Sequence, residues 1–569
     1  MKKSTNLVKS SAVVAMAVCL AMSGVACGRG GDEKIDVTMS QINIQSWNGD
    51  FHLTWLEEIA GRFEEAYKDY SFEEGKKGVQ VFVNPGNVVY DSFTTSISTM
   101  TEEIFVGEQM NYYLFVNKDT VMDISDAVTT PLTEYGESKS IVDKMSDDMW
   151  DFYGVGDSEN KTERSYYGLP WYETYPGFFY DKQLFEEEKL YFAAEGEGRD
   201  GWIVNAKTKK GTGPDGVFGT DDDGLPATYD DFFKLLDKMY SLDMEPVAWG
   251  GNAQIYLNAT LSALAADYEG YDSMMTNYTL SGETQIVSKI NADGTIELED
   301  LSVSKENGYQ LYQQAGFYYG LQFLERLLST KDELGKPKYY DPMHSTSTSY
   351  THRAVQNTFL RGGYVADVKT RIGILLDSSW WYSGAEETFK NMSSIPGGAS
   401  LERSIGMMPM PKVDAEHLGE ATYFDNWMSN VVVRKDIDES KVPMIKQFIR
   451  FMHTDESLSK FTQLTSAVRP FVYELAEADE ANTSVFGKQM LQIHNNSKIV
   501  HPWSKNDLVL NNLGAFMLNE SRYTSIVGDS YNLVSNAIRS GVTAKQYFEG
   551  FKKSFSQSNW NNTYSKYFS

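Results

Sequence analysis

The segment 168–185, GLPWYETYPGFFYDKQLF, decides the prediction for this chain, because its aromatic side chains surround a single acid, Glu173. Aromatic rings are flat and apolar, as are the C–H faces of a sugar ring, whereas sugar hydroxyls need carboxylate or amide partners. This composition favours a carbohydrate-binding segment. The alternative interpretation is a buried aromatic strand followed by a helix that starts near Asp181.

The start of the chain has the pattern of a signal peptide. Its first nine residues carry three lysines and no acid, and the uncharged run 10–28 is shorter in its apolar part than a membrane-spanning helix. We therefore expect residues 1–26 to be removed on export.

A cysteine closes this run in the sequence Gly24-Val25-Ala26-Cys27, which resembles the bacterial lipobox. In that motif small residues precede a cysteine that receives lipid, and the motif prefers Leu where this chain has Gly24. Cys19 lies inside the removed segment, so Cys27 would be the single cysteine of the exported protein. The sequence predicts a lipid anchor on Cys27 and a tether over 27–35, with an ordinary signal-peptidase site as the alternative.

Charge and length narrow the classes of partner and fold. The 569 residues include 79 Asp and Glu against 51 Lys and Arg, for a formal net charge of -28 at pH 7. An acidic surface of this kind repels phosphates and anionic lipid head groups. We therefore expect no nucleic-acid ligand, and we expect contact with the membrane only through the lipid anchor. The length exceeds one compact domain, and 41% hydrophobic residues suffice for two large lobes.

The exported part opens with a β-α-β pattern. An alternating strand over 42–47 ends in turn residues, and helical spacing over 54–67 follows a Thr54 to Glu57 capping box. Further strands are expected at 79–83 and 104–106. The pattern predicts an α/β fold with a parallel sheet whose ligand loops gather at the carboxyl edge.

Two stretches interrupt this pattern. Residues 195–225 are rich in Gly, Asp and Lys, and residues 268–298 are rich in Thr and Ser before a hairpin signal at Ala292-Asp293-Gly294. Neither has the apolar period of a core layer, so we expect both to be surface insertions.

Two adjacent tryptophans follow a later strand. The apolar run 372–376 leads through Asp377 to Trp380 and Trp381. Neighbours on one strand or turn cannot usually both face the core, so at least one indole is expected to be partly exposed at a loop tip. A ligand would account for that exposure.

These pieces, in this order, resemble the extracellular solute-binding proteins of ABC importers, in particular the large carbohydrate-binding group that includes the maltose-binding protein. The resemblance runs from about residue 42 to the end, and its order and spacing are more specific than any single motif. The two insertions depart from the smaller members of the family. The marks of the resemblance are Trp47-Asn48-Gly49-Asp50, 167–182, Pro226 to Asp231 before a helix, 376–381, 406–412 and FIRFMHTDES at 448–457.

The resemblance implies a two-lobe, type II periplasmic-binding-protein-like fold. Each lobe would be a mixed, mainly parallel sheet flanked by helices, with the ligand cleft between the lobes. The first lobe would comprise 36–165 and 412–468, and the second 166–411 and 469–569. The implied protein is a monomeric, non-enzymatic receptor on the outer face of the cytoplasmic membrane, which captures an oligosaccharide or other sugar and delivers it to the permease subunits of an ABC importer.

Candidate ligand-binding residues combine strand-end tryptophans with positions carried over from the family. Aromatic rings would stack on sugar faces, and acids, amides and an arginine would bind hydroxyls. Core packing is the alternative for each of them. The aromatic set is Trp47, Tyr112, Tyr113, Trp171, Tyr175, Trp249, Trp380, Trp381 and Trp427, and the polar set is Asp50, Glu173, Asp377, Asn426 and Arg469.

The first insertion carries a cluster of acids. Asp215, Asp221 and Asp223 stand among glycines and offer the hard oxygens that calcium prefers, although the EF-hand register fails because no Glu occupies its twelfth position. A structural calcium ion is one interpretation, and a solvated acidic turn is the other. No other cofactor is expected, since the seven histidines form no HExxH motif and the chain has no P-loop.

Two other classes of function are compatible with parts of the sequence. A secreted glycoside hydrolase would need two carboxylates across a cleft, and Glu173 with Asp377 could fill those roles. A hydrolase barrel would repeat a strand-helix unit eight times, whereas this chain alternates in two halves. An anchored protein-binding module is the second alternative, and the acidic surface is compatible with it.

Overall fold

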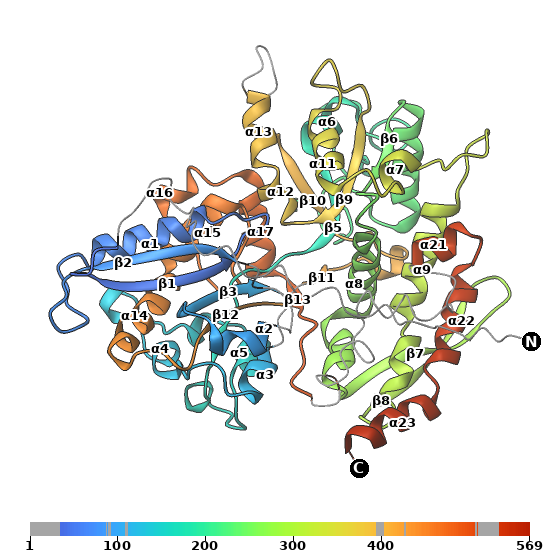
Figure 1. The fold of residues 1–569 in the computed structure, drawn as a ribbon. Helices are drawn as coiled ribbons and strands as arrows, with labels where there is room; N and C mark the ends of the chain where they lie inside the picture. Colours follow the sequence, from blue (N-terminus) through green and yellow to red (C-terminus); the bar gives the residue numbers. More distant parts are fainter. Residues whose placement is uncertain are drawn as a thin grey trace, which may run out of the picture.

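The computed structural model describes residues 35–86, 88, 93–108, 112–393, 403–425, 428–506, 509 and 534–568. The predicted lipid-attachment residue Cys27 and the predicted ligand residues Asn426 and Trp427 lie outside these ranges. The described chain forms two lobes, with the blue N-terminal elements in one and the green and yellow elements in the other (Figure 1).

The first lobe is built on a sheet with the strand order β2-β1-β3-β12-β4. β1 pairs in parallel with β2 and β3, as the β-α-β pattern predicts, and β12 runs antiparallel to β3 and β4. The elements of this lobe are β1 (Ser40–Trp47), α1 (Thr54–Ala66), β2 (Val79–Gly86), α2 (Phe93–Ser96), β3 (Ile104–Glu108), α3 (Tyr112–Asn117), α4 (Ser125–Thr129), α5 (Asp147–Tyr153), β4 (Gly168–Leu169), β12 (Ser429–Val433), α14 (Val442–Met452) and α15 (Asp455–Thr465).

The second lobe is built on a sheet with the strand order β10-β5-β9-β6. β5 is antiparallel to β10 and β9, and β6 is parallel to β9. The elements up to β10 are β5 (Pro176–Asp181), α6 (Lys182–Glu187), α7 (Tyr229–Ser241), β6 (Glu245–Ala248), α8 (Ile255–Thr279), β7 (Gly282–Ile290), β8 (Ile296–Val303), α9 (Ala315–Ser329), α10 (Pro342–Ser345), α11 (His352–Arg361), β9 (Ile372–Ser378), α12 (Trp381–Gly384), α13 (Glu386–Ser393) and β10 (Ile405–Met408).

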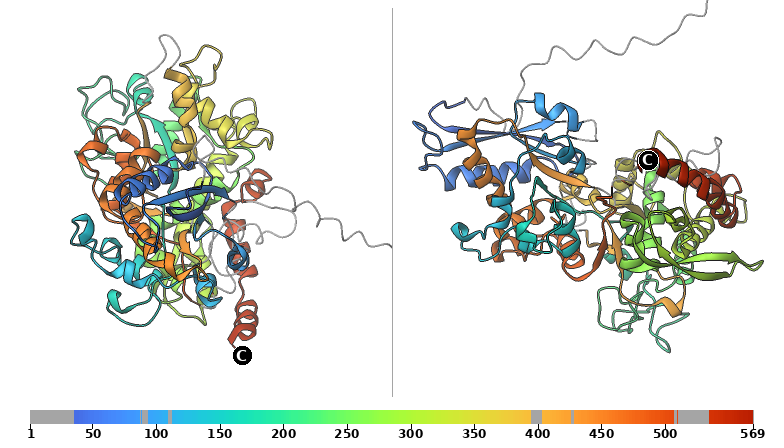
Figure 2. Two further views of the ribbon diagram at one scale, coloured as in Figure 1. Left: turned by 60° about the vertical axis from the view of Figure 1, so that its left-hand side comes forward. Right: turned by 90° about the horizontal axis from the view of Figure 1, so that it is seen from below.

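The C-terminal helices pack along the second lobe, where Figure 2 shows them in red. They are α21 (Val534–Arg539), α22 (Ala544–Ser554) and α23 (Gln557–Phe568). α21 and α22 lie against α9, and Trp560 in α23 donates a hydrogen bond from Nε1 to the Lys305 carbonyl at 2.7 Å. The hairpin of β7 and β8 is thereby tied to the end of the chain.

Both sheets are mixed. The strands next to the crossings between the lobes, β4, β5, β10 and β12, make antiparallel pairs. β4 of the first sheet leads to β5 of the second, and β10 leads back through β11 (Thr422–Phe424) to β12. β11 pairs in parallel with β13 (Lys498–Val500) in the middle of the molecule (Figure 1). β13 follows α16 (Glu477–Glu480) and α17 (Val485–Asn496).

The chain after β13 makes a third passage. His501 Nδ1 lies 2.9 Å from Asp148 Oδ2 of the first lobe, and Ser504 donates a hydrogen bond to the Tyr278 carbonyl of the second lobe. Three segments therefore form the hinge: 170–175, 409–425 and 497–506.

The aromatic stretch of 168–185 continues as a core strand. All six residues of β5 are buried, and α6 begins after Asp181, whose side chain accepts a hydrogen bond from Gln183 N. Phe178 lies against Phe232 and Phe323, with ring centroids 4.7 and 5.8 Å apart. The structure thus follows the alternative that the sequence left open, a buried aromatic strand followed by a helix at Asp181.

Two large apolar clusters hold the described chain together. One fills the second lobe around α7, α8 and α9. The other extends from the first lobe across the hinge to residues of the second sheet, including Phe179, Leu375 and Met407. The lobes therefore share a core at the hinge.

α1 and α8 differ from their predictions. The N-cap of α1 is Leu53, whose carbonyl accepts the Glu57 N–H, and no side chain caps the helix, so the predicted capping box does not form. α8 extends into the stretch predicted to be a surface insertion and buries Met274 and Tyr278. These two residues have helical spacing, but the surrounding Ser, Thr and Asn residues gave no apolar period from which a helix could be predicted.

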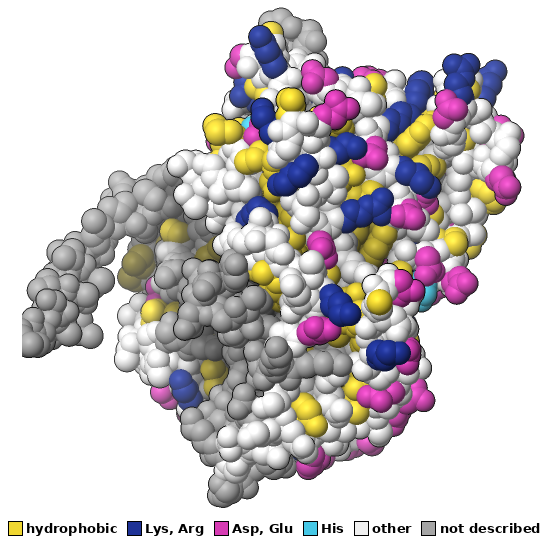
Figure 3. Space-filling model, turned by 90° about the vertical axis from the view of Figure 1, so that its right-hand side faces the viewer, with side chains coloured by type: hydrophobic (Ala, Val, Ile, Leu, Met, Phe, Trp, Pro, Cys, Tyr) yellow, Lys and Arg dark blue, Asp and Glu magenta, His cyan; other side chains and the backbone are white. Residues whose placement is uncertain are grey.

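The surface carries charges of both signs. Figure 3 shows Lys and Arg interspersed with Asp and Glu over the visible face of the second lobe. Among the helices of the described ranges, none has the length and apolar character needed to span a membrane.

Candidate functional site

The carboxyl end of β1 meets the second lobe at Asp50. Asp50 forms an ion pair with Arg353 at the start of α11, and Arg353 Nη1 donates to the Gly384 carbonyl at 3.0 Å. A Cβ on Gly384 would lie 2.8 Å from Asp50 Cγ, so only glycine permits this approach. The predicted ligand residue Asp50 therefore bridges the two lobes.

Asp377 ends β9 beside this bridge. Its carboxylate accepts hydrogen bonds from Gln356 Nε2 at 2.9 Å and from Ser378 N at 2.8 Å. Burial raises the pKa of Asp377 to about 7, with a smaller upward contribution from the charge of Asp50. The carboxyl group can therefore hold a proton near neutral pH and donate as well as accept.

The two adjacent tryptophans lie in different surroundings. Trp381 is fully buried, with ring centroids 5.8 Å from Phe179 and 5.7 Å from Phe359. Trp380 is partly exposed, packs against the apolar clusters of both lobes and lies edge-on to Tyr256 at 6.3 Å. The structure thus assigns the partly exposed indole to Trp380.

Trp47 and Tyr113 are the other predicted aromatic residues with exposed surface. Trp47 ends β1 and covers Gly49 so closely that a Cβ there would overlap the indole ring. Tyr113 donates from its hydroxyl to the Phe152 carbonyl at 2.8 Å. Both are half-buried.

Several predicted ligand residues are instead packed in the core. Trp171 stacks on Trp55 at 5.5 Å and donates from Nε1 to the Gly107 carbonyl at 2.8 Å. Arg469 donates from Nη1 to the Met452 carbonyl at 2.6 Å. These side chains have no exposed face for a sugar, because packing and hydrogen-bond partners occupy their surface. The buried set is Tyr112, Trp171, Glu173, Tyr175, Trp249, Asp377, Trp381 and Arg469.

Glu173 lies at the hinge, fully enclosed by protein partners. It accepts a hydrogen bond from the Tyr175 hydroxyl, and its two oxygens lie 3.0 Å from His494 Nδ1 and 2.9 Å from His501 Nε2. Burial alone would raise the pKa of Glu173, but His494 and His501 together hold that pKa below its ordinary range. Asp148 and Glu173 in turn raise the pKa of His501 against the lowering effect of burial.

The sequence signals did not identify several residues of these sites. Arg353, Tyr256 and His352 lie beside Asp50, Asp377 and Trp380, but they come from helices whose sequences carry no ligand motif. His494 and His501 are seven residues apart and face the hinge from α17 and from the end of β13, a juxtaposition created by the fold.

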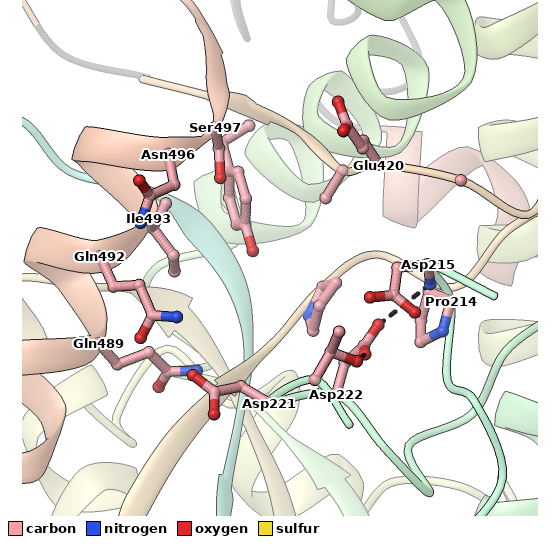
Figure 4. A pocket seen from close by; sticks show the side chains of 15 residues that line it. Pro214, Asp215, Asp221, Asp222, Glu420, Gln489, Gln492, Ile493, Asn496 and Ser497 are labelled. Carbon is pink, nitrogen blue, oxygen red and sulfur yellow. Dashed lines mark hydrogen bonds between the residues drawn. The ribbon is translucent and has the colours of Figure 1, made fainter. Parts of the chain in front are cut away.

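The acidic insertion borders a cavity of about 230 Å³ beside α17 (Figure 4). Asp215 accepts from Val217 N at 2.7 Å, and Asp223 accepts from Gly219 N at 2.9 Å. Asp222 accepts from Asp215 N at 3.1 Å. These carboxylates hold the backbone of their own loop, and calcium binding by Asp215, Asp221 and Asp223 stays a prediction.

Comparisons with known proteins support the fold. No family model matches the chain, and no curated protein matches it. A chitin oligosaccharide binding protein aligns with a TM-score of 0.54 and 15% identity, covering 92% of this chain and 99% of its own. A structure from work on xylan utilization by Caldanaerobius polysaccharolyticus aligns with a TM-score of 0.53 and 11% identity, covering 91% and 100%. Maltose-bound MalE3 of T. maritima aligns with a TM-score of 0.51 and 12% identity, covering 91% and 99%.

At 11–15% sequence identity, these structural alignments establish the fold alone, and they cover 99–100% of each neighbour. The described chain forms two lobes, each built on a mixed sheet. The chain therefore has the two-lobe, type II fold of the solute-binding proteins, as its sequence predicts.

Proposed function

We propose that this protein is the sugar-binding component of an ABC importer, which captures an oligosaccharide outside the cell and delivers it to the membrane permease. The observation that carries the proposal is the ion pair between Asp50 of the first lobe and Arg353 of the second, beside Asp377 and Trp380. Paired polar groups from two lobes, beside a partly exposed indole, suit a sugar ring.

The side chains around the Asp50–Arg353 pair would contact different parts of a sugar. Trp380 is a partly exposed indole that would stack on the C–H surface of a sugar, and Trp47 at the end of β1 is a second candidate. Asp50 would accept from hydroxyls, and the planar guanidinium of Arg353 would donate to two oxygens at once, whereas the buried Asp377 would act from behind them through its charge. Because the polar groups come from both lobes, a bound sugar would hold the lobes together.

Tryptophan fluorescence of the exported chain, titrated with chito-, xylo- and malto-oligosaccharides, tests the proposal. Trp380→Ala should weaken binding of the preferred sugar at least about tenfold, or about 1.4 kcal/mol. Trp202→Ala is the matched control, because Trp202 is also half-buried in the second lobe but belongs to the 195–225 insertion. Equal binding by the parent and Trp380→Ala, or a loss confined to Trp202→Ala, would place the sugar elsewhere.

The same incubations separate a receptor from a glycoside hydrolase. Chromatography of the sugars after prolonged contact with the protein should return them unchanged. Shortened products would instead support catalysis, for which Glu173 and Asp377 would be the first residues to test.

Attachment to the membrane through Cys27 belongs to the same proposal. Its support is the Lys-rich start, the short apolar run and the lone mature cysteine. Membrane fractionation of a Cys27→Ala variant should move the protein to the soluble extracytoplasmic fraction. If the variant stays with the membrane as the parent does, the anchor is not Cys27.

A further inference from the structure

Each of the three hinge segments places one side chain of a metal-ligand type in the same buried position. Glu173 belongs to the first crossing, Asp425 follows β11, and His501 follows β13. One ligand atom from each lies within 4.8 Å of the others. Elsewhere in the described ranges, no group of three or more His, Cys, Asp or Glu side chains is gathered this closely.

The contacts of His501 with two carboxylates call for a positive charge, either a second proton on the ring or a metal ion beside it. Its Nδ1 lies 2.9 Å from Asp148 Oδ2, and its Nε2 lies 2.9 Å from Glu173 Oε2. A neutral imidazole carries one N–H, so donation to Asp148 leaves the Nε2 lone pair facing the Glu173 carboxylate. Carboxylates that orient a histidine through its outer nitrogen are typical of metal-bound histidines.

His494 repeats this arrangement on the other oxygen of Glu173. Its Nε2 lies 3.0 Å from the Phe471 carbonyl, which can only accept, so Nε2 carries the proton. Its Nδ1 then faces Glu173 Oε1 at 3.0 Å. Either two extra protons or one metal ion resolves the contacts of both histidines with Glu173.

The position of Asp425 favours the metal. Asp425 is 1% exposed and adds a second buried carboxylate to the cluster, and one divalent cation compensates two such charges. Ligand atoms around a tetrahedral ion with bonds of about 2.0–2.1 Å lie about 3.3 Å apart, close to the nitrogen-oxygen separations beside Glu173.

We infer that Glu173, Asp425 and His501 bind a divalent transition-metal ion of the zinc type at the hinge, with Asp148 orienting His501. Imidazole nitrogen together with carboxylate oxygen is a ligand set suited to such ions. His494 Nδ1 is placed to complete the coordination. Because each ligand comes from a different crossing segment, the ion would link the three strands about which the lobes move.

Metal titration of the exported chain, purified without a histidine tag and stripped with a chelator, tests this inference. Calorimetry with Zn²⁺ should give one saturable site, and the melting temperature should rise with zinc concentration by mass action. Equimolar Ca²⁺, which prefers oxygen ligands, should not displace the zinc.

Variants locate the site. His501→Ala and Asp425→Asn should each bind zinc at least about tenfold more weakly, and Asp148→Asn, which leaves the ligands in place, should lower the affinity about 10–100-fold. His344→Ala is the control, because His344 pairs with Glu245 in the second lobe, away from the hinge.

Two results would overturn the inference. One is the absence of zinc binding and of any thermal shift at millimolar zinc. The other is zinc binding by Asp148→Asn and Asp425→Asn that equals that of the parent. If His501→Ala does not fold, these two variants decide the outcome.

Discussion

Trp380 and Trp381 are neighbours in the sequence, yet only Trp381 is enclosed on every side, by Phe179, Phe359 and Phe486. Its truncation leaves a large core cavity, so Trp381→Ala should lower the free energy of unfolding by about 3–5 kcal/mol. Urea denaturation followed by circular dichroism measures this loss. Trp380→Ala should cost clearly less stability, and equal losses in both variants would contradict the assignment of Trp381 to the core.

Asp377 should make stability depend on pH. Its folded pKa of about 7 lies above the ordinary value of 3.8, so the folded state holds a proton that the unfolded chain releases as pH rises from about 4 to 7. The Asp377 contribution to stability is therefore full below about pH 4, falls through that window and is constant above it.

Replacement by asparagine removes this dependence. The difference in unfolding free energy between Asp377→Asn and the parent should shift in favour of the variant by roughly 2–4 kcal/mol as pH rises from 4 to 7. Above pH 7 this difference should stay constant. Urea denaturation at a series of pH values measures the difference. Parallel stability curves for the variant and the parent would mean that Asp377 is ionised in the folded protein across this range.

At the residue scale, the sequence identified kinds of side chain better than their surroundings. Asp50 and Asp377 were predicted, and both lie where the lobes meet. The burial of Trp171 and Trp249 could not be predicted, because the local sequence pattern of an aromatic residue at a strand end is the same whether the residue faces a ligand or the core. His494 and His501 left no motif at all, since the fold alone brings them together.

At the element scale, one buried ion pair ties α8 to the crossing between β10 and β12. Lys412 Nζ lies 2.8 Å from Asp267 Oδ1, and the side chains are 4% and 3% exposed. Asp267 also accepts from Thr422 N at 3.1 Å, at the start of β11. The pair therefore fixes the crossing at two points.

Breaking this pair should be costly. Asp267→Asn leaves the Lys412 charge buried and unpaired, so the free energy of unfolding should fall by about 3–5 kcal/mol. The double variant Asp267→Leu with Lys412→Met should recover much of that loss. Asp230→Asn, which removes an exposed partner of Arg326, is the control and should cost less than about 1 kcal/mol in the same urea denaturation. A loss no larger for Asp267→Asn than for this control would mean that the pair does not anchor the crossing.

Elements with strong periodicity were predictable, and those with mixed composition were not. Strands occur where alternation or an apolar run predicts them, at 42–47, 79–83 and 372–376. The second half of α8 was not predicted, because polar residues separate its buried residues. The helix is also kinked at Gly270, which has a φ of 74°.

At the scale of the whole molecule, the Asp50 to Arg353 pair should bias the lobes toward closure. Their side chains are 17% and 52% exposed, and a pair of this kind contributes about 0.2–1 kcal/mol. Arg353→Ala should therefore shift the closed population by no more than about fivefold, seen as a larger radius of gyration in small-angle scattering without ligand.

The charge-conserving variant separates the pair from other effects. Arg353→Lys retains the charge opposite Asp50 and should scatter more like the parent than Arg353→Ala does. If both variants scatter alike, the lobes are held by the shared hinge core instead.

The two-lobe architecture was predictable because the order of many weak motifs constrains it more than any one of them. The division of the chain between lobes at 165 and 411 stays a prediction, and the identity of the sugar depends on contacts that no local pattern encodes. The structural neighbours are matched over 91% or more of this chain, but at 11–15% identity they leave the ligand open.

Calorimetric titration of the exported protein with a panel of oligosaccharides tests whether a sugar binds between the lobes. We expect saturable binding of at least one oligosaccharide at one molecule per protein, with a negative heat-capacity change as ring faces are buried. Binding confined to peptides or amino acids, with no heat from any sugar in the panel, would contradict it.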